Sequence, residues 1–587
     1  MATGSGNIRG AAEARKAGKP GKVMGLTEAI RDFLRPGMTI HLAAGIGGPS
    51  AAICEIMRQH WGRAPGFTVI QSTVTGHALN LVHCGLVRKL VCAACPDISA
   101  SARPSRIVQR ALETHAFELE NWSLCSLQQR LMAGAFGVPF MPTKSILGSS
   151  IAVDNAHSFR EIADPFGSGA SVGLVQALRP DISIVHACVG DAEGNVIPAA
   201  PYGDDLWGAL ASREGVLVTV ERLVPTSVIQ QYAALVKVPS YRVQAVIPAP
   251  LGLHPFSLAN PGIGGLEPYD QDTEFLNELH TASLSPATLD AWLRQWVIGC
   301  SHGRYLEKLG SSRIDALKRS AQPAATAAAP VSAGGSVQSG DYEPREMMIV
   351  ALAREILNSV AQHGHKLILA GAGIGATAAF LAYCQLREQG DDIELVTGNG
   401  QLGYTPVPGR SILTNEAGVR SAKMLTDTVT MQGVLVGGAH SRCLSILGAG
   451  QIDKFGNINS TRSGKGTFLV GSGGANDAMN AREVFLCVDQ SPERFAAKLA
   501  HLTACGTAVT TVVSTAGVFR KGRPHEEMYL AACFTGGQSP DLAALVDNVR
   551  QQCGWDLKVS SQVAAIPGPT ESELRLLRWI VGSSPKE

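Results

Sequence analysis

The sequence lacks an excess of charge of either sign. Its 587 residues include 50 Lys and Arg against 49 Asp and Glu, and the formal net charge at pH 7 is +1. A protein that binds nucleic acid or an anionic membrane usually carries a clear basic excess. The balance gives no electrostatic argument for either partner, and we expect neither nucleic acid nor a membrane to bind.

A secretory signal and a disulfide framework are also missing. The N-terminal residues contain no apolar core of the kind that signal peptides need. The 13 cysteines are scattered, which favours free thiols in a reducing compartment and predicts a cytoplasmic protein. Cys92 and Cys95 form the only CxxC pair, after an apolar run. We interpret them as part of a buried strand, with a redox or zinc site as the alternative, and we predict no metal site.

One uncharged run is long enough to cross a bilayer. Residues 367–386 contain 20 residues without a charge. Gly371, Gly373 and Gly375 alternate within it, and they would weaken a membrane-spanning helix. A buried strand, a glycine turn and a buried helix explain the run better.

A low-complexity segment divides the chain. Residues 319–342 are almost wholly Ala, Pro, Ser, Gly and polar residues without apolar periodicity, which is typical of a linker. Residues 1–22 are small, polar and basic, and predict a disordered tail. The remaining parts, 23–318 and 343–587, each alternate short apolar β-rich runs with helical stretches. This pattern predicts two tandem open α/β domains with largely parallel sheets.

The two parts also resemble each other. The sequence AGIG occurs at residues 44–47 and again at 372–375, each time between a strand-like run and a helical run. Later, VGDAEGNVI at Val189–Ile197 is echoed by QIDKFGNIN at Gln451–Asn459. We therefore expect two similar domains, joined head to tail and packed as a pseudo-dimer.

The glycine turns suit an anion more than a nucleotide. A strand, a glycine turn and a helix direct backbone N–H groups at one point, where an anion or a developing oxyanion is stabilised. Residues 371–376 (GAGIGA) have the spacing G-x-G-x-G rather than G-x-G-x-x-G, and the acidic residue of a dinucleotide site is missing. Residues 463–467 (SGKGT) lack the preceding glycine of a triphosphate loop.

Several motifs together resemble a known family. GAGIGATAA (371–379), LGAGQIDKFGNIN (447–459) and GSGGAND (471–477) resemble the β-subunit of class I coenzyme A transferases, most closely the glutaconate type. GIGGPS (45–50) and the long stretch Glu118–Ser150 are similar to the α-subunit. The resemblance covers most of both parts and implies two subunits fused in one chain, with an acyl-CoA as the small-molecule substrate.

The same resemblance implies the binding loops and the assembly. It implies no tightly bound cofactor, because coenzyme A enters as part of the substrate, and it allows a homo-oligomer. The residues expected to bind coenzyme A lie in the glycine loops and are Gly45, Gly47, Gly48, Gly373, Gly375, Asn399, Gly400, Gly471, Gly473 and Gly474.

One position departs from the family. In the transferases the stretch corresponding to Leu395–Pro406 contains a glutamate that attacks the acyl-CoA and carries coenzyme A as a thioester; Gly398 stands in its place here. Glycine cannot form the anhydride or the thioester. Glu394 lies roughly 13 Å back along the strand, too far to replace it without a large rearrangement. We expect the missing side chain to enlarge the pocket.

Relatives of this fold without the glutamate include a decarboxylase of a branched glutaconyl-CoA and a hydrolase that opens a ring of a steroid-derived CoA thioester. Such chemistry needs an oxyanion hole and an acid–base group. Glu118 and Glu120 are spaced by two, so both face the same way on a strand. We predict Glu120 as the base, with its pKa raised by a pocket partly closed to water, and Glu118 as the reserve. Solvent-facing acids before a helix are the alternative.

Three hypotheses follow. The first is a hydrolase or lyase that cleaves a carbon–carbon bond of an acyl-CoA. The second is a coenzyme A transferase that uses another carboxylate or a direct ternary mechanism. The third is a non-catalytic acyl-CoA-binding protein.

Overall fold

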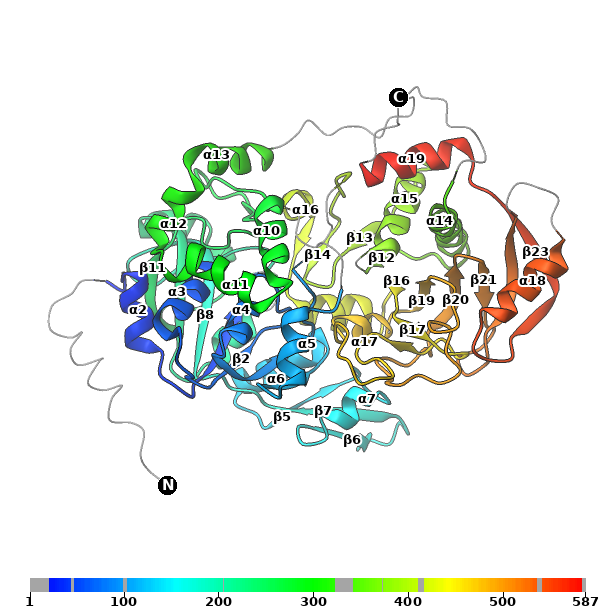
Figure 1. The fold of residues 1–587 in the computed structure, drawn as a ribbon, viewed down its shortest axis with the longest axis horizontal. Coiled ribbons are helices and arrows are strands. Elements are labelled where there is room, and N and C mark those ends of the chain that lie inside the picture. The colour runs from blue at the N-terminus through cyan, green and yellow to red at the C-terminus, as the bar shows by residue number, and fades with distance from the viewer. Residues whose placement is uncertain are drawn as a thin grey trace.

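The structure is a computed structural model that describes two α/β halves lying side by side (Figure 1). The described residues are 21–43, 47–98, 103–203, 205–322, 342–371, 373–409, 416–535 and 541–582. Most of the predicted tail and linker, and the predicted binding residue Gly45, lie outside these ranges. Two open α/β domains with largely parallel sheets were predicted, and both are present.

The first half is built on a sheet of eight strands. Seven follow the order β11-β10-β8-β1-β2-β3-β4 with parallel neighbours, and β9 is antiparallel to β8. The central strand β8 (ISIVHACVG) is buried at every position, as expected of a parallel strand covered on both faces. The bounds are β1 Thr39–Ala43, β2 Phe67–Ile70, β3 Val87–Cys92, β4 Glu118–Asn121, β8 Ile182–Gly190, β9 Val196–Pro198, β10 Val216–Leu223 and β11 Val243–Pro248.

Helices cover both faces of this sheet. Ile40 and Leu42 of β1 belong to the core shared with α2 to α5, α10 and α11, whereas Ala43 packs with α8 on the opposite face. The bounds are α2 Leu26–Phe33, α3 Ser50–His60, α4 His77–His83, α5 Arg106–Glu113, α6 Leu124–Phe136, α7 Ser150–Asp154, α8 Asp205–Ala211, α9 Thr226–Gln231, η1 Ala233–Leu235, η2 Ser240–Arg242, α10 Thr273–Ser283, α11 Pro286–Leu293, η3 Arg294–Ile298, α12 His302–Leu309 and α13 Ser311–Ser320.

A small antiparallel sheet, which the sequence reasoning did not predict, packs beside α6. Its order is β5-β7-β6, with bounds Phe140–Thr143, Ser171–Gln176 and Phe159–Ala163. Trp122, Leu127 and Phe159 belong to the core beneath it. Helix α6 begins at a capping box in which Ser123 and Ser126 bond each other's backbone N–H, and it ends at Gly137 in the left-handed conformation.

The second half contains a sheet of ten strands. Strands β13, β12, β16, β19 and β20 are neighbours and parallel, which makes the centre of the sheet resemble that of the first half. Antiparallel pairs extend both edges, followed at one edge by the parallel pair β22 and β23, so the order is β15-β14-β13-β12-β16-β19-β20-β21-β22-β23. The bounds are β12 Leu367–Ala370, β13 Glu394–Val396, β14 Gln401–Leu402, β15 Met424–Leu425, β16 Cys443–Gly448, β19 Glu483–Val488, β20 Val509–Ser514, β21 Gly517–Arg520, β22 Tyr529–Thr535 and β23 Lys558–Pro567; β17 Gln451–Ile452 and β18 Ile458–Asn459 form a separate pair.

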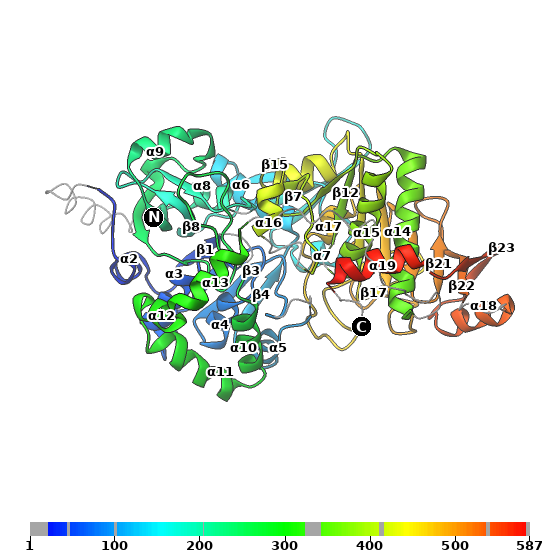
Figure 2. The ribbon, with the colours of Figure 1, turned by 90° about the horizontal axis from the view of Figure 1, so that it is seen from above.

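The helices of the second half include α14, α15 and α19, which pack together over the sheet and share one core with it (Figure 2). The bounds are α14 Pro344–His363, α15 Ile374–Glu388, α16 Glu416–Ser421, η4 Val429–Val436, α17 Ala475–Ala478, α18 Leu542–Gln551 and α19 Glu571–Val581. The uncharged run 367–386 forms the strand β12 and most of α15, as predicted. No helix in the described part of the chain is long and apolar enough to cross a membrane.

The two similar segments Val189–Ile197 and Gln451–Asn459 make the same hydrogen bonds in the two halves. In the first half, Asp191 Oδ1 accepts the backbone N–H of Asn195 at 2.9 Å, and Asp191 Oδ2 accepts Nδ2 of Asn195 at 2.8 Å. In the second half, Asp453 accepts from Asn457 in the same way, at 3.0 and 2.8 Å. Identical side-chain bonding in both halves supports a duplicated domain.

The described structure extends into the end of the predicted tail and into the start of the predicted linker. Lys22, placed in the tail, donates its backbone N–H to Ala192 at 2.7 Å. At the linker, α13 continues to Ser320, and Ala321 is fully buried. Arg420 of the second half donates to the carbonyl oxygen of Ala321 at 2.7 Å, so a contact between the halves orders this end.

Candidate active site

The turn between β13 and β14 lies at the carboxyl edge of the second sheet. Thr397 donates its backbone N–H to Gln401 at 3.0 Å, and its hydroxyl bonds Asn399 Oδ1 at 2.6 Å. Gly400 has a φ of +108°, and a Cβ there would lie under 3.0 Å from the carbonyl oxygen of Thr426. Position 400 therefore requires glycine for both its conformation and the close approach of the backbone.

Gln432 of η4 occupies the space beside Gly398. A Cβ built on Gly398 would lie under 3.0 Å from Nε2 of Gln432, a separation that real Cβ atoms essentially never show. The Gln432 side chain is buried, and its Oε1 has no hydrogen-bond partner among the residues that the structure describes. The enlarged pocket expected at Gly398 is therefore wrong, because an amide fills the space.

The loop that begins at Gly471 joins the two halves. The N–H of Gly473 donates to the carbonyl oxygen of Ala93 at 2.9 Å, and the N–H of Leu124 donates to Gly473 at 2.9 Å. The N–H of Ser472 donates to Asn121 Oδ1 at 3.1 Å. This glycine-rich loop is thus held against the ends of β3 and β4 by backbone bonds.

Two predicted binding glycines of this loop sit close to other groups. Gly471 has a φ of +106°, and a Cβ there would lie 2.6 Å from the carbonyl oxygen of Ala93. A Cβ on Gly474 would lie 2.9 Å from Nε2 of Gln432. Gly398 and Gly474, predicted from separate motifs, therefore meet at the same Gln432 amide.

Asp477 is a buried carboxylate at the junction of the two halves. Its Oδ1 accepts the hydroxyls of Ser145 at 2.6 Å and Ser123 at 2.9 Å, and its Oδ2 accepts the N–H of Cys125 at 2.9 Å. Burial raises the pKa of Asp477 to about 6, although these three hydrogen bonds lower it in part. A carboxyl group with this pKa exchanges a proton near neutral pH.

Glu120, the predicted base, is held by four side chains. Its carboxylate contacts Arg130 at 2.5 Å, Lys89 at 2.6 Å, Trp122 Nε1 at 2.7 Å and His157 at 3.3 Å. Burial alone would raise the pKa of Glu120, but the charges of Arg130 and Lys89 and the Trp122 bond lower it to about 2. The expected rise in pKa is wrong because the cations outweigh the loss of solvent.

The other two acids considered from the sequence are less enclosed. Glu118 contacts the same Lys89 at 3.4 Å, so Glu118 and Glu120 do share one face of β4, but the Glu118 side chain is exposed. Glu394, at the start of β13, forms an ion pair with Lys423. That pairing holds Glu394 at the far end of the strand from Gly398.

The remaining predicted glycines lie in the turns after β1 and β12. Gly47 has no room for a side chain because the ring of Phe256 occupies that space, and Gly48 has a φ of +68°. Gly373 has a φ of +86° before α15, and a Cβ on Gly375 would lie 3.2 Å from Ile446. Each glycine is explained by local packing or conformation, and binding of coenzyme A at these turns stays a prediction.

Cys92 and Cys95 are both buried at the end of β3, with their sulfur atoms 3.1 Å apart. The hydrogen bond with Cys92, together with burial, raises the pKa of Cys95 well above its usual value. A protonated buried pair of this kind favours the buried-strand interpretation over a reactive thiol.

Sequence reasoning missed Gln432, which no motif singled out. It included Asp477 only as the last residue of the GSGGAND motif, whereas the carboxylate accepts hydrogen bonds from residues of the first half. Both contacts join segments far apart in the chain, so no spacing rule points to them.

Comparison with known proteins supports a single family relationship. Residues 23–249 match the family model described as coenzyme A transferase. The A-type subunit of glutaconate CoA-transferase from Acidaminococcus fermentans is 28% identical over 51% of this chain and 94% of its own length. The B-type subunit of 3-oxoadipate CoA-transferase from Pseudomonas knackmussii is 29% identical over 40% of this chain and 92% of its own.

The chain is also similar to a hydrolase subunit and to an uncharacterized protein, and it shares the fold of a further transferase. The cholesterol ring-cleaving hydrolase IpdA subunit of Mycobacterium tuberculosis is 29% identical over 43% of this chain and 87% of its own length. The chain also spans 64% of an uncharacterized protein of Archaeoglobus fulgidus, at 28% identity. The acyl-CoA transferase YdiF of Escherichia coli O157:H7 shares the fold over 96% of this chain and 97% of its own, with a TM-score of 0.62 and 15% identity. Residues 23–249 therefore match the coenzyme A transferase family model, and parts of the chain are similar to an A-type and a B-type subunit of coenzyme A transferases.

Proposed function

We propose that the chain cleaves a carbon–carbon bond of an acyl-CoA, by hydrolysis or decarboxylation, without a covalent glutamyl-CoA intermediate. The observation that carries this proposal is the pairing of Gly398 with Gln432. The position that the family resemblance gives to the attacking glutamate has no side chain, and a neutral amide occupies the adjacent space. An amide does not attack a thioester to form an anhydride, so acyl transfer lacks its nucleophile here.

Gln432 has the chemistry of an oxyanion donor. When a carbon–carbon bond at the α-carbon of a thioester breaks, or one at the γ-carbon of a conjugated enoyl thioester, the electron pair of that bond moves onto the carbonyl oxygen and forms an enolate or a dienolate. A buried N–H donor fixed in advance stabilises that oxygen without reorganisation at the moment of reaction. The Gln432 amide lies beside both the turn at Gly398 and the loop at Gly474.

The reaction also requires a proton carrier. In decarboxylation the enolate takes a proton at carbon after carbon dioxide leaves; in hydrolysis a base first activates water for attack on the adjacent ketone. Asp477, with a pKa of about 6, is better matched to this task than Glu120, whose pKa of about 2 makes it a weak base. We assign proton transfer to Asp477 through the hydroxyls of Ser123 and Ser145, with Glu120 and Glu118 as the second candidates.

Coenzyme A transfer is the second candidate function. The similarity to both subunits of transferases favours it. Because position 398 is glycine, transfer would require a carboxylate at another position as the nucleophile, or direct transfer between two bound substrates.

The test uses two probe thioesters. Glutaconyl-CoA reports decarboxylation, and 2-oxocyclohexanecarboxyl-CoA reports hydrolytic ring opening, with products identified by mass spectrometry. Borohydride is added in parallel to trap any glutamyl-CoA adduct, and acetate serves as the acceptor for transfer. We expect carbon dioxide release or ring opening without a trapped adduct.

A matched pair of variants links the result to the site. Gln432→Ala should lower kcat/KM about 10²- to 10³-fold, as loss of one oxyanion donor does elsewhere. Gln389→Ala, which changes an exposed glutamine at the end of α15, should leave it unchanged. A trapped glutamate or labelled acetyl-CoA would overturn the proposal in favour of transfer, and coenzyme A binding without turnover of either probe would overturn it in favour of a binding protein.

A further inference from the structure

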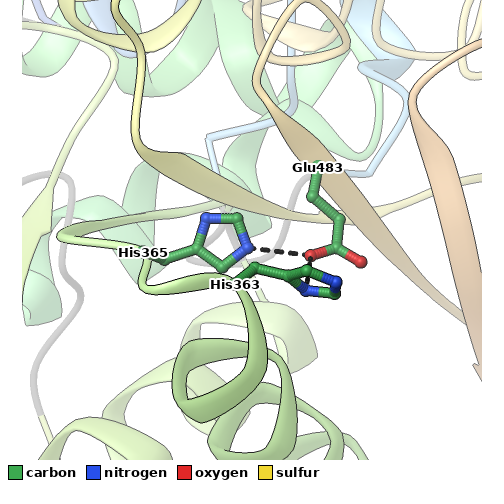
Figure 3. Close-up of side chains that lie close together, drawn as sticks. All are labelled: His363, His365 and Glu483. Atoms are coloured by element: carbon green, nitrogen blue, oxygen red, sulfur yellow. Dashed lines mark hydrogen bonds and ion pairs between the residues drawn. The ribbon is translucent and has the colours of Figure 1, made fainter.

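A cluster of two histidines and a glutamate lies at the edge of the second sheet opposite the candidate active site. His363 is the last residue of α14, His365 precedes β12, and Glu483 is the first residue of β19 (Figure 3). Gly364 caps α14 in the left-handed conformation, with a φ of +62°. This reversal lets two histidines separated by one residue turn toward the same carboxylate.

The ligand atoms of the cluster converge on one oxygen. His365 Nε2 lies 2.8 Å from Glu483 Oε2, and His363 Nδ1 lies 3.3 Å from the same oxygen. One donor atom from each of the three residues falls within 4.8 Å of the other two. His365 and Glu483 are buried and His363 is exposed, so the cluster is enclosed on one side and open to solvent on the other.

We propose that His363, His365 and Glu483 bind a divalent transition-metal ion, with zinc as the best match. The ligands are His363 Nδ1, His365 Nε2 and Glu483 Oε2. Two imidazoles and one carboxylate form a borderline-soft set that selects zinc over calcium or magnesium, which prefer oxygen ligands throughout. The exposed side at His363 leaves a coordination position for water.

Ser359 and Thr510 orient the Glu483 carboxylate through hydrogen bonds, as residues next to a metal ligand usually do. The Ser359 hydroxyl donates to Glu483 Oε2 at 2.5 Å, and the Thr510 hydroxyl donates to Oε1 at 2.6 Å. Hydrogen bonds of this kind fix a ligand in place and preserve metal affinity. Glu355, whose charge interacts with that of Glu483, is paired with Arg520 at 2.6 Å.

The metal would join β19 to α14 and β12, which are consecutive elements far from β19 in the chain. Glu483 is separated from His365 by 118 residues, which is why spacing rules predicted no metal site here. Binding would connect the end of α14, the start of β12 and the start of β19. Because these starts lie at the amino edge of the parallel strands, the site is separate from the carboxyl-edge turn at Gly398, and its expected role is to stabilise the second half.

The experiment uses the full chain without a histidine tag, stripped with a chelator and dialysed. Zinc binding is measured by competition with a chromogenic indicator, and Co²⁺ is added separately because its visible absorption reports coordination by nitrogen and oxygen. We expect one zinc per chain, a rise in the thermal midpoint with zinc, and Co²⁺ absorption bands that zinc removes.

The substitutions should leave the protein folded, so that a loss of zinc binding can be attributed to the loss of a ligand. His363→Ala removes the exposed ligand, and Glu483→Gln keeps the shape and one of the two oxygen atoms that accept hydrogen bonds from Ser359 and Thr510. Each should weaken zinc affinity more than 10-fold relative to the unmodified chain, a change of more than about 1.4 kcal/mol. His525→Ala, an exposed histidine outside the cluster, is the matched control and should bind zinc normally. Absence of saturable zinc binding, or equal binding by all four proteins, would overturn the proposal.

Discussion

Because the Gln432 amide lies against Gly398, we expect a substitution at position 398 to change the stability of the protein. This effect can be measured without a substrate. Gly398 is not among the glycines with positive φ, so its backbone accepts an L-residue. At such a position Gly→Ala stabilises by about 0.4–1 kcal/mol, because the unfolded chain loses freedom. Here the new methyl group would meet the Gln432 amide under 3.0 Å. The amide is the end of a flexible side chain and must move to admit the methyl group; because Gln432 is buried, we expect this movement to cost about 1–3 kcal/mol, so the net effect of Gly398→Ala should be destabilising.

The effect of Gly398→Ala on stability should change sign when the Gln432 amide is removed. In a Gln432→Ala background, Gly398→Ala no longer meets Nε2, and it should stabilise the second half by up to about 1 kcal/mol. The coupling between the two substitutions is then about 1–3 kcal/mol, which is measurable as a shift of about 2–4 °C per kcal/mol in the thermal midpoint of a domain this size. Differential scanning calorimetry of the full chain measures it.

The control is Gly464→Ala. A Cβ there meets nothing within 4 Å, and its φ is also not positive. This variant should be neutral or slightly stabilising in both backgrounds. If Gly398→Ala raises the midpoint in the unmodified chain, or if its effect is the same with and without Gln432, the amide does not fill the space beside position 398 and the reasoning fails.

Three further predictions concern the site. The double variant Gly398→Glu with Gln432→Ala should yield a borohydride-trapped adduct with an acyl-CoA, whereas Gly398→Glu alone should yield less, because Gln432 blocks the new side chain; equal trapping would contradict this. The folded pKa of Asp477 lies at about 6 against 3.8 for the free group, so its contribution to stability is full below pH 4 and falls by about 3 kcal/mol as the pH rises through 6. Relative to Asp477→Asn, the unmodified chain should therefore lose thermal stability between pH 4 and 6, and a constant difference would refute it. Arg130→Met removes one cation from the buried Glu120, which keeps its contacts with Lys89, Trp122 and His157, and should destabilise by about 3–5 kcal/mol at pH 7, with the loss shrinking as the pH falls below 4.5 in urea titrations.

Much of the fold was predictable because it depends on local patterns. Short apolar β-rich runs that alternate with helical stretches indicated parallel sheets, and the strand-like runs before the two AGIG motifs correspond to β1 and β12. The aspartate and asparagine of the two echoed turns were recognised as equivalent, and they make the same hydrogen bonds. The uncharged run was resolved correctly into strand and helix because alternating glycines are incompatible with a long apolar helix.

The chemistry of the site was less predictable because it depends on partners from other elements. The spacing of Glu118 and Glu120 correctly placed both on one face of β4. It could not reveal that Arg130 on α6 and Lys89 on β3 lie against Glu120 and lower its pKa instead of raising it. In the same way, a glycine at position 398 indicates a missing side chain, but only tertiary packing shows that Gln432 fills the space.

The position of Asp477 ties the chemistry of the site to the packing of the two halves. All three of its hydrogen-bond donors, Ser123, Ser145 and Cys125, belong to the first half, whereas the carboxylate belongs to the second. Burial at this contact is what raises its pKa, so separation of the halves would return the carboxyl group to solvent and to its ordinary pKa. The raised pKa of Asp477 therefore depends on the contact between the two halves. Because one chain supplies both halves, the contact forms at a high effective concentration and does not depend on the abundance of a second polypeptide.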